Sequence, residues 1–499
     1  MRYNSTRGSR PEANSSQVIW QGIAADGGLF VPDGIPRLPL EELTSIFSAG
    51  YGALAERVLR PFLSDFSSED LRRCLQRAYN PRKFAHHKIT PLGYLGDGLS
   101  LLELWHGPTL AFKDLALQIL PHLLTTAMDH LGAAGEVVIL VATSGDTGKA
   151  ALAGFEDVER TRIVVFYPAK GVSTIQEYQM VTQTGNNTYV VAVEGNFDDA
   201  QRGVKEIFTD PEMISRLQAQ NRRFSSANSI NWGRLVPQIV YYFAAYLELV
   251  HQQRISLGDS INVVVPTGNF GNILAAYYAR CMGLPICRLI SAANRNDVVA
   301  QFINTGVYDR RREFHQTRSP SMDILVSSNL ERLLYELTDR DHTLVKSWMQ
   351  DLGEKGWYQV PEGVHKRIKS LFWAGSCDDE QTLKTIRSVY AQYDYVVDPH
   401  TAVALDVYGQ YVQETKDSTP TVVASTASPL KFVESVALAL FGAEEIQGLD
   451  EFALLGLLAE RTGLVVPDSL RTLAQMPRRH ERTCQPLEMP KVVLELLSH

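Results

Sequence analysis

Apolar residues along the chain gather in short β-branched runs, each followed by a turn of small residues and then by a helical pattern. Three such runs lie at residues 137–142, 261–265 and 421–424. Further apolar runs lie between helical segments, at residues 162–167, 189–193 and 286–292. Strands that alternate with helices predict parallel sheets joined by crossover connections. The pattern therefore predicts an α/β fold.

The regions around these strand–turn–helix segments differ in composition and in predicted secondary structure. Residues 26–39 are rich in Gly and Pro, and the helical pattern at 40–79 predicts an N-terminal element outside the sheets. Residues 295–393 are charged, rich in helical pattern and poor in strand runs, which predicts an insertion. After residue 441, short helices lead to a proline-marked tail. We expect an N-terminal region at 1–95, an α/β body at 96–435 and a C-terminal helical segment at 436–499.

Charge and apolar content narrow the classes of partner. The chain has 48 basic and 56 acidic residues, a formal net charge of −8, which argues against nucleic acid. The most apolar helix-length stretch, residues 235–250, contains Gln238 and Glu248 and is shorter than the roughly 20 residues that span a bilayer. It predicts a buried helix and no membrane association.

Cysteine usage and the N-terminus bear on location. Five widely scattered cysteines without C-x-x-C indicate reduced thiols, and hence a cytoplasmic protein without structural zinc. Residues 1–16 are polar and lack the apolar run of a secretory signal. Their arginines and serines leave a transit peptide as the alternative.

Two of the turns have the composition of a phosphate site. In residues 266–272, Gly268 and Gly271 allow a tight curl whose N–H groups converge at a helix start and favour a dianion. A tight turn that needs glycine for its dihedral angles explains the same residues. The turn at 143–148 adds hydroxyl groups, although these could also simply cap a helix. It is not a nucleotide P-loop, because the motif would require Gly at Thr143 and Ser or Thr at Ala150.

A lysine and a third turn complete the candidate chemistry. Lys113 lies in a largely apolar segment, where desolvation would lower its pKa and free the amine for a Schiff base. An isolated lysine is otherwise a solvated surface residue. The turn at 425–429 offers neutral hydroxyls that suit an unprotonated ring nitrogen, or it starts a helix with Pro429 in the first turn. H-E-x-x-H and G-x-S-x-G are absent, so neither a metal site nor a hydrolase triad is predicted.

Four segments, taken in their order along the chain, resemble the motifs of a known enzyme family. They are HGPTLAFKD at 106–114, TSGDTG at 143–148, PTGNFGN at 266–272 and STASP at 425–429. Together they resemble the threonine synthase family of fold-type II pyridoxal-phosphate (PLP) enzymes. YNSTRG, QGIAADGGLFVP, NSINWGR and DPHTA extend the likeness along the chain. The resemblance implies two wound parallel-sheet domains of the tryptophan synthase β kind, with a helical N-terminal region and a helix-rich insertion.

The resemblance also implies roles for individual residues. Lys113 matches the catalytic Schiff-base lysine. The other positions that match cofactor-binding residues are Asp146, Gly268, Asn269, Phe270, Gly271, Asn272 and Thr426. Those that match substrate-binding residues are Thr143, Ser144, Thr147, Asn228 and Arg234. Ser428 departs from the pattern, because this branch of the family commonly has His there.

The family reaction is a PLP-dependent lyase reaction of amino-acid biosynthesis. It converts O-phospho-L-homoserine and water to L-threonine and phosphate, so the resemblance implies a small-molecule substrate. We expect a monomer or a homodimer. Two alternatives stay open: a related phospho-lyase that releases a keto acid, and a non-catalytic relative that only binds PLP.

Overall fold

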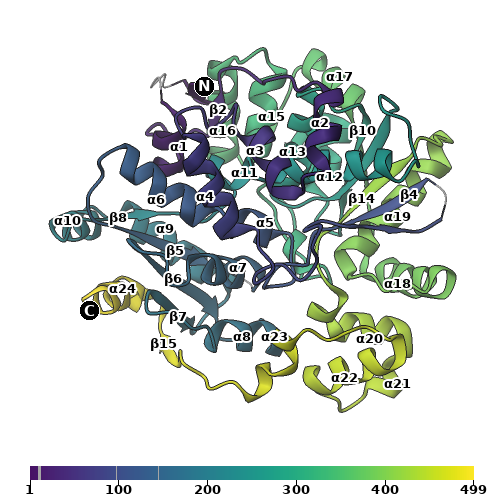
Figure 1. The fold of residues 1–499 in the computed structure, drawn as a ribbon. Helices are drawn as coiled ribbons and strands as arrows, with labels where there is room; N and C mark the ends of the chain where they lie inside the picture. Colours follow the sequence, from purple (N-terminus) through teal and green to yellow (C-terminus); the bar gives the residue numbers. More distant parts are fainter. Residues whose placement is uncertain (9–12, 97, 144, 499) are drawn as a thin grey trace.

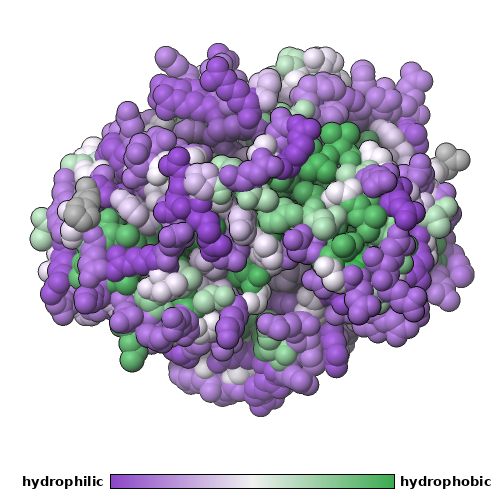
Figure 2. Space-filling view, turned by 90° about the horizontal axis from the view of Figure 1, so that it is seen from below, coloured by the Kyte–Doolittle hydropathy of each residue, from purple (hydrophilic) through white to green (hydrophobic). Residues whose placement is uncertain are grey.

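The structure is a computed structural model that describes residues 1–8, 13–96, 98–143 and 145–498. Two sheets form the centres of two α/β lobes, and the N-terminal helices lie across both (Figure 1). The C-terminal stretch runs from the larger lobe along the underside to the smaller one (Figure 1). Seen from below, the surface is mostly hydrophilic, with apolar side chains in separate patches (Figure 2).

The larger sheet has the strand order β13-β10-β9-β14-β4-β3, and only the β3–β4 pair is antiparallel. Its strands are β3 (Leu92–Tyr94), β4 (Leu99–Glu103), β9 (Ile261–Pro266), β10 (Ile286–Ala293), β13 (Phe372–Ser376) and β14 (Thr421–Ser425). Every residue of β9 and β14 is buried, as expected of parallel strands covered on both faces. The surrounding helices are α11 (Trp232–Leu235), α12 (Gln238–His251), α13 (Gly271–Cys281), α18 (Asp379–Tyr393) and α19 (Pro399–Thr415).

The smaller sheet is parallel throughout, in the order β15-β7-β6-β5-β8. Its strands are β5 (Glu136–Ala142), β6 (Thr161–Pro168), β7 (Thr188–Val193), β8 (Arg222–Ser225) and β15 (Arg482–Cys484). The associated helices are α5 (Lys113–Leu117), α6 (Leu120–His130), α7 (Asp146–Phe155), α8 (Thr174–Val181), α9 (Phe197–Thr209) and α10 (Pro211–Ala219). Val137 and Ile139 of β5 pack into one hydrophobic cluster and Val138 and Leu140 into another, so helices cover both faces.

Although β3, within the expected range of 1–95, joins the larger sheet, the N-terminal region up to residue 79 packs on these lobes without joining either of the two sheets. Its elements are β1 (Tyr3–Ser5), α1 (Ser15–Gln21), β2 (Phe30–Pro32), α2 (Leu40–Phe47), α3 (Tyr51–Leu59) and α4 (Ser68–Ala78). β1 and β2 pair antiparallel, and Tyr3 packs edge-on against Trp232 of α11. The predicted α/β fold and the six predicted strand runs are confirmed.

Two short strands from regions expected to be helical join the edges of the two large sheets. The stretch 295–393 is mostly helical, but β13 within it joins the edge of the larger sheet. Its other elements before α18 are α14 (Val298–Thr305), β11 (Val307–Asp309), η1 (Pro320–Met322), α15 (Leu330–Leu337), α16 (His342–Glu354), β12 (Trp357–Gln359) and α17 (Glu362–Leu371). Residues 436–499 are not purely helical either, because β15 pairs with β7. Both strands are short edge strands without a long apolar run, so the apolar pattern did not reveal them.

The C-terminal elements link the two lobes. They are η2 (Pro429–Lys431), α20 (Val433–Phe441), α21 (Ala443–Ile446), α22 (Glu451–Thr462), α23 (Asp468–Arg471), η3 (Leu473–Gln475), η4 (Pro486–Glu488) and α24 (Met489–Leu497). Within the described part of the chain, no helix is both long and apolar enough to cross a bilayer.

The packing of α7 on α5 depends on a glycine. A Cβ added at Gly154 would lie 2.1 Å from the carbonyl oxygen of Leu117, a backbone atom that cannot move alone. We expect Gly154→Ala to lower the free energy of unfolding by about 1–3 kcal/mol through overpacking, measurable by urea denaturation. The matched control is Gly409→Ala in α19, where a Cβ meets open space. That variant should be about 0.5–1 kcal/mol more stable, and equal stability of both variants would contradict the prediction.

Candidate functional site

A cavity of about 1700 Å³ lies between the two lobes and reaches the carboxyl ends of strands in both sheets. Residues from all four motif segments line it, among them Lys113, Thr143, Gly268 and Thr426. Carboxyl ends of parallel strands are where α/β proteins bind ligands. The turns that the sequence analysis singled out therefore meet around one space.

The segment before Lys113 pairs with the turn after β14. The N–H of Phe112 donates to the carbonyl oxygen of Thr426 at 2.8 Å, and the N–H of Ser428 donates to that of Leu110 at 3.0 Å. These two hydrogen bonds hold the start of α5, and thus Lys113, beside the end of the larger sheet. The Ser428 hydroxyl accepts from the N–H of Leu430 at 3.3 Å and caps η2.

Lys113 lines the cavity, and its amine lies in a polar cluster. Its Nζ is 3.5 Å from the hydroxyl of Ser321 and 3.6 Å from Oδ2 of Asp146, and its side chain is 11% exposed. Burial lowers the pKa of Lys113 to about 8, although the Asp146 carboxylate opposes this shift. The neutral form of the amine is therefore easier to reach than in a solvated lysine, as the sequence analysis anticipated.

Asp146, the first residue of α7, is surrounded by donors. Gln176 donates to its Oδ1 at 2.9 Å, the Ser321 hydroxyl donates to Oδ2 at 2.5 Å, and the Lys431 amine lies 2.9 Å from Oδ1. Burial raises the pKa of Asp146, but Lys431 and Lys113 outweigh this effect and hold the pKa well below its usual range. The carboxylate is therefore ionised.

His400 fixes the backbone of Ser321. Its Nε2 accepts from the Ser321 N–H at 3.2 Å, and its Nδ1 lies 2.8 Å from Asp398. The sequence analysis missed Gln176, Ser321 and His400 as members of this cluster. DPHTA was the only signal, since it contains His400.

The glycine turn between β9 and α13 has the geometry of an anion site. Phe270 adopts a left-handed conformation with φ of 63°, and the first N–H groups of α13 have no partner inside the helix. The carbonyl oxygens of Gly268 and Asn269 accept from Ser327 at 2.7 Å and from the Asn329 N–H at 3.1 Å. The turn is thus held from one side while its helix start faces the cavity.

Several buried donors on this cavity lack partners among the described residues, and Nδ2 of Asn272 and Nε of Arg234 are two of them, beside Nε1 of Trp20 and the Ser225 hydroxyl. The Asn272 amide is oriented by Tyr241 and Tyr242, whose hydroxyls both donate to its Oδ1. Unsatisfied buried donors cost about 1–3 kcal/mol each. Their presence here indicates that the cavity is built to bind groups rich in acceptors.

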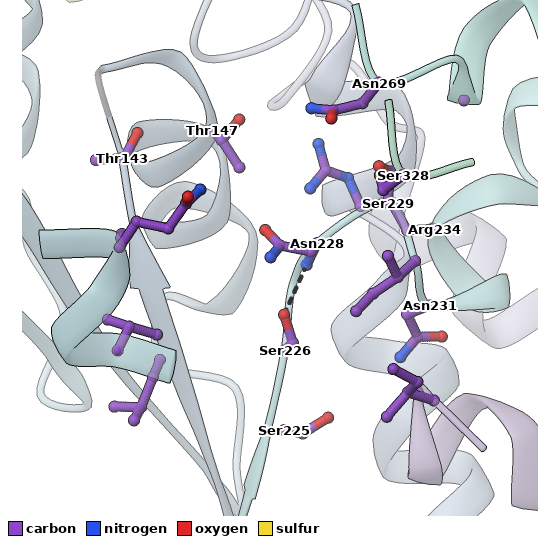
Figure 3. A pocket seen from close by; sticks show the side chains of 18 of the residues that line it. Thr143, Thr147, Ser225, Ser226, Asn228, Ser229, Asn231, Arg234, Asn269 and Ser328 are labelled. Carbon is purple, nitrogen blue, oxygen red and sulfur yellow. Dashed lines mark hydrogen bonds between the residues drawn. The ribbon is translucent and has the colours of Figure 1, made fainter. Parts of the chain in front are cut away.

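Arg234 is a buried cation without a described carboxylate partner. One nitrogen donates to the carbonyl oxygen of Ala227, and burial lowers its pKa to about 10, which leaves it charged at neutral pH. Arg234, Asn228 and Asn269 surround one opening, and Thr143 and Thr147 lie across from it (Figure 3). This opening suits an anionic ligand.

Thr143 has a second role that the alternative interpretation anticipated. Its hydroxyl accepts from the N–H groups of Gly145 and Gly148, at 3.0 and 2.9 Å, and so caps the turn into α7. The hydroxyl proton stays available to a ligand. Ser144 lies outside the described residues. No group of three or more His, Cys, Asp or Glu within the described part of the chain could hold a metal ion.

Comparisons with known proteins agree with this geometry. Residues 2–79 match the family model for the threonine synthase N terminus, 87–427 that for PLP-dependent enzymes, and 401–491 that for the threonine synthase C-terminal region. Threonine synthase from Pseudomonas aeruginosa is 43% identical over 89% of this chain and 91% of that protein. Human threonine synthase-like 1 is 41% identical, and the match covers 85% of this chain and 58% of that protein.

A solved structure gives the same assignment at the level of the fold. PLP-bound threonine synthase from Brucella melitensis superposes with a TM-score of 0.88, at 36% identity and with 99% of each chain covered. The PLP family model covers most of the chain, and the relatives share more than a third of its residues. The chain belongs to the threonine synthase family of pyridoxal-phosphate-dependent enzymes.

Proposed function

We propose that this protein converts O-phospho-L-homoserine and water to L-threonine and phosphate, with PLP as its cofactor. The observation that carries the proposal is one cavity with three features. They are an amine of lowered pKa on Lys113, an amide donor on Asn272 that has no partner among the described residues, and a buried guanidinium on Arg234 that faces no described carboxylate. The cofactor and the substrate each carry a phosphate, which matches two separate donor groups.

The cavity residues fit PLP. The start of α13 and Nδ2 of Asn272 would bind its phosphate, Lys113 its aldehyde carbon and Thr426 its ring nitrogen. The remaining residues of the proposed cofactor site are Asp146, Gly268, Asn269, Phe270 and Gly271. A Cβ at Gly268 would lie 3.2 Å from the carbonyl oxygen of Ser321, so glycine lets the turn approach η1 closely. When bound, PLP supplies an electron sink for negative charge on the carbons next to the substrate amine.

Lys113 is the proposed proton carrier of the reaction. With its amine free beside the bound substrate, Lys113 would accept the proton from Cα, return that proton, and only then accept the proton from Cβ. A pKa of about 8 suits repeated proton transfer near neutral pH. The Ser321 hydroxyl and Asp146, 3.5 and 3.6 Å from Nζ, would orient the amine between these steps.

Arg234 is the proposed receptor for the substrate phosphate. A guanidinium can bind two phosphate oxygens at once and stabilise the charge that grows as phosphate departs. Asn228 and Thr147 on the same opening would add hydrogen bonds, and Thr143 and Ser144 belong to the same proposed substrate site. Water then adds at Cβ after phosphate leaves.

Product identification tests the proposed reaction directly. The full chain, loaded with PLP, is incubated with O-phospho-L-homoserine, and the products are separated on a chiral column. We expect L-threonine and phosphate in equal amounts, with none formed when the cofactor is omitted. Formation of 2-oxobutyrate instead would establish the phospho-lyase, and bound cofactor without phosphate release would establish a non-catalytic relative.

We further propose three regions, at 1–95, 96–435 and 436–499. The three family models support this division, because they match residues 2–79, 87–427 and 401–491. The five free cysteines support a cytoplasmic location. We propose a monomer or a homodimer, which light scattering of the purified chain would distinguish.

A further inference from the structure

Lys431 is a fully buried amine to which the reaction above assigns no role. It ends η2, is 1% exposed, and donates to the carbonyl oxygen of Thr109 at 2.8 Å. Its Nζ also lies 2.9 Å from Oδ1 of Asp146. Removing an ammonium group from water is costly, so a fold retains one only where strong partners offset that cost.

The two oxygens of Asp146 have different partners. Oδ1 faces Lys431 and accepts from Gln176, whereas Oδ2 accepts from Ser321 and faces Lys113. Lys431 and Gln176 therefore fix the rotation of the carboxylate about its own axis. This leaves Oδ2 directed at the amine that reacts.

Several charged groups act on Lys113 from different elements. Asp146 of α7 favours its protonated form, while Arg234 of α11 and Lys431 of η2 disfavour it. His400 of α19 acts on Asp146, and Asp114 of α5 acts on Lys431. Lys431 thus has two opposite effects on Lys113: it repels the ammonium directly and it holds the attracting carboxylate in place.

We propose that Lys431 is a positioning residue, which fixes the Asp146 carboxylate and adds a second positive charge that favours the neutral, reactive Lys113 amine. This inference rests on the proposed role of Lys113 in binding PLP. An alternative is that Lys431 only ties down the loop at Thr109. That role would change stability but not the protonation of Lys113.

The test is the pH dependence of PLP loading in the full chain, followed by the visible absorption of the bound cofactor. PLP itself titrates in this range, so the comparison is between variants under identical conditions. In the parent protein, the rate of PLP loading should rise with pH as Lys113 loses its proton, and the midpoint of this rise should lie near the pKa of about 8. Lys431→Met should move the midpoint upward by about one pH unit, because one nearby like charge is lost while Gln176 and Ser321 still hold the Asp146 carboxylate. Loading at pH 7 should then be about tenfold slower.

Two further variants separate a charge effect from a structural one. Asp146→Asn should lower the midpoint, because the charge that stabilises the ammonium is lost. The double variant Asp146→Asn with Lys431→Met should return it close to the parent value. Lys149→Met is the matched control, since this lysine is also largely buried but donates to Gln183 rather than to Asp146. Its midpoint should not move.

The pH midpoints of PLP loading test the role of Lys431 whichever product the protein forms. An unchanged midpoint in Lys431→Met, or a double variant without compensation, would overturn it. If Lys431→Met does not fold, the midpoints of Asp146→Asn and of the double variant still test the inference. The double variant removes both Asp146 and Lys431, so it leaves neither charge buried without its partner. Failure to form threonine, with the expected midpoints, would reject the proposed reaction and leave the role of Lys431 intact.

Discussion

Lys113→Ala should abolish turnover and the visible absorption band of the bound cofactor together. Lys113 both holds PLP and moves the protons in the proposed reaction, and it lines the cavity with its amine beside Ser321. We expect kcat to fall by about 10⁴-fold or more, because acid–base catalysis by one side chain is typically worth about 10²–10⁴-fold. Threonine formation and the absorption spectrum would be measured on the same preparation.

Lys149→Met, already described, serves as the control for loss of a largely buried lysine and should keep both the band and the activity. Borohydride reduction followed by peptide mapping gives a second check. The reduced cofactor should be attached to Lys113 in the parent protein and to no peptide in Lys113→Ala. Attachment to Lys431, which shares the Asp146 carboxylate, would reassign the reactive amine.

The sequence predicted the strands well because buried parallel strands carry a strong local signal. β9 and β14 are apolar along their whole length and lie between turns of small residues. β13 and β15 carry no such signal, since edge strands of three to five residues need little apolar sequence. Their pairing is decided by the neighbouring strand rather than by their own residues.

Part of the site was predictable and part was not. The glycine turn at 266–272 and Lys113 have local features, and the topology of parallel strands brings such turns to one edge. Ser321 and Lys431 have none: each is an ordinary polar residue in a short 3₁₀ turn. Their roles arise only because both turns reach Asp146, on the other lobe.

Thr143 shows how one residue satisfies two interpretations. A hydroxyl at the start of a helix predicts a cap, and the hydrogen bonds to Gly145 and Gly148 confirm it. The same residue lines the cavity, and its contact with substrate stays a proposal. Local sequence could not choose between these roles because they are compatible.

Arg234→Ala should cost about 10³-fold in kcat/KM for O-phospho-L-homoserine. Loss of one buried charged partner typically costs 2–5 kcal/mol, and about 4 kcal/mol corresponds to this factor. We expect KM to rise, because the substrate phosphate loses its receptor, and kcat to fall, because the departing phosphate loses a countercharge. The visible band should persist, since the proposed PLP contacts lie at Lys113, Thr426 and the start of α13.

Two other arginine variants define what the guanidinium contributes. Arg234→Lys keeps a positive charge but loses the planar fork, so we expect an intermediate loss. Arg223→Ala removes an arginine from the same cavity, stacked 3.8 Å above Trp20, and should change kcat/KM by less than about threefold. If Arg234→Ala loses the cofactor band, and excess PLP restores turnover with an unchanged substrate KM, Arg234 binds the cofactor, and the substrate phosphate must be held by Asn228 and the hydroxyls of the turn at 143–148. A kcat/KM equal to that of Arg223→Ala would instead show that the charge of Arg234 serves only the packing around Ala227.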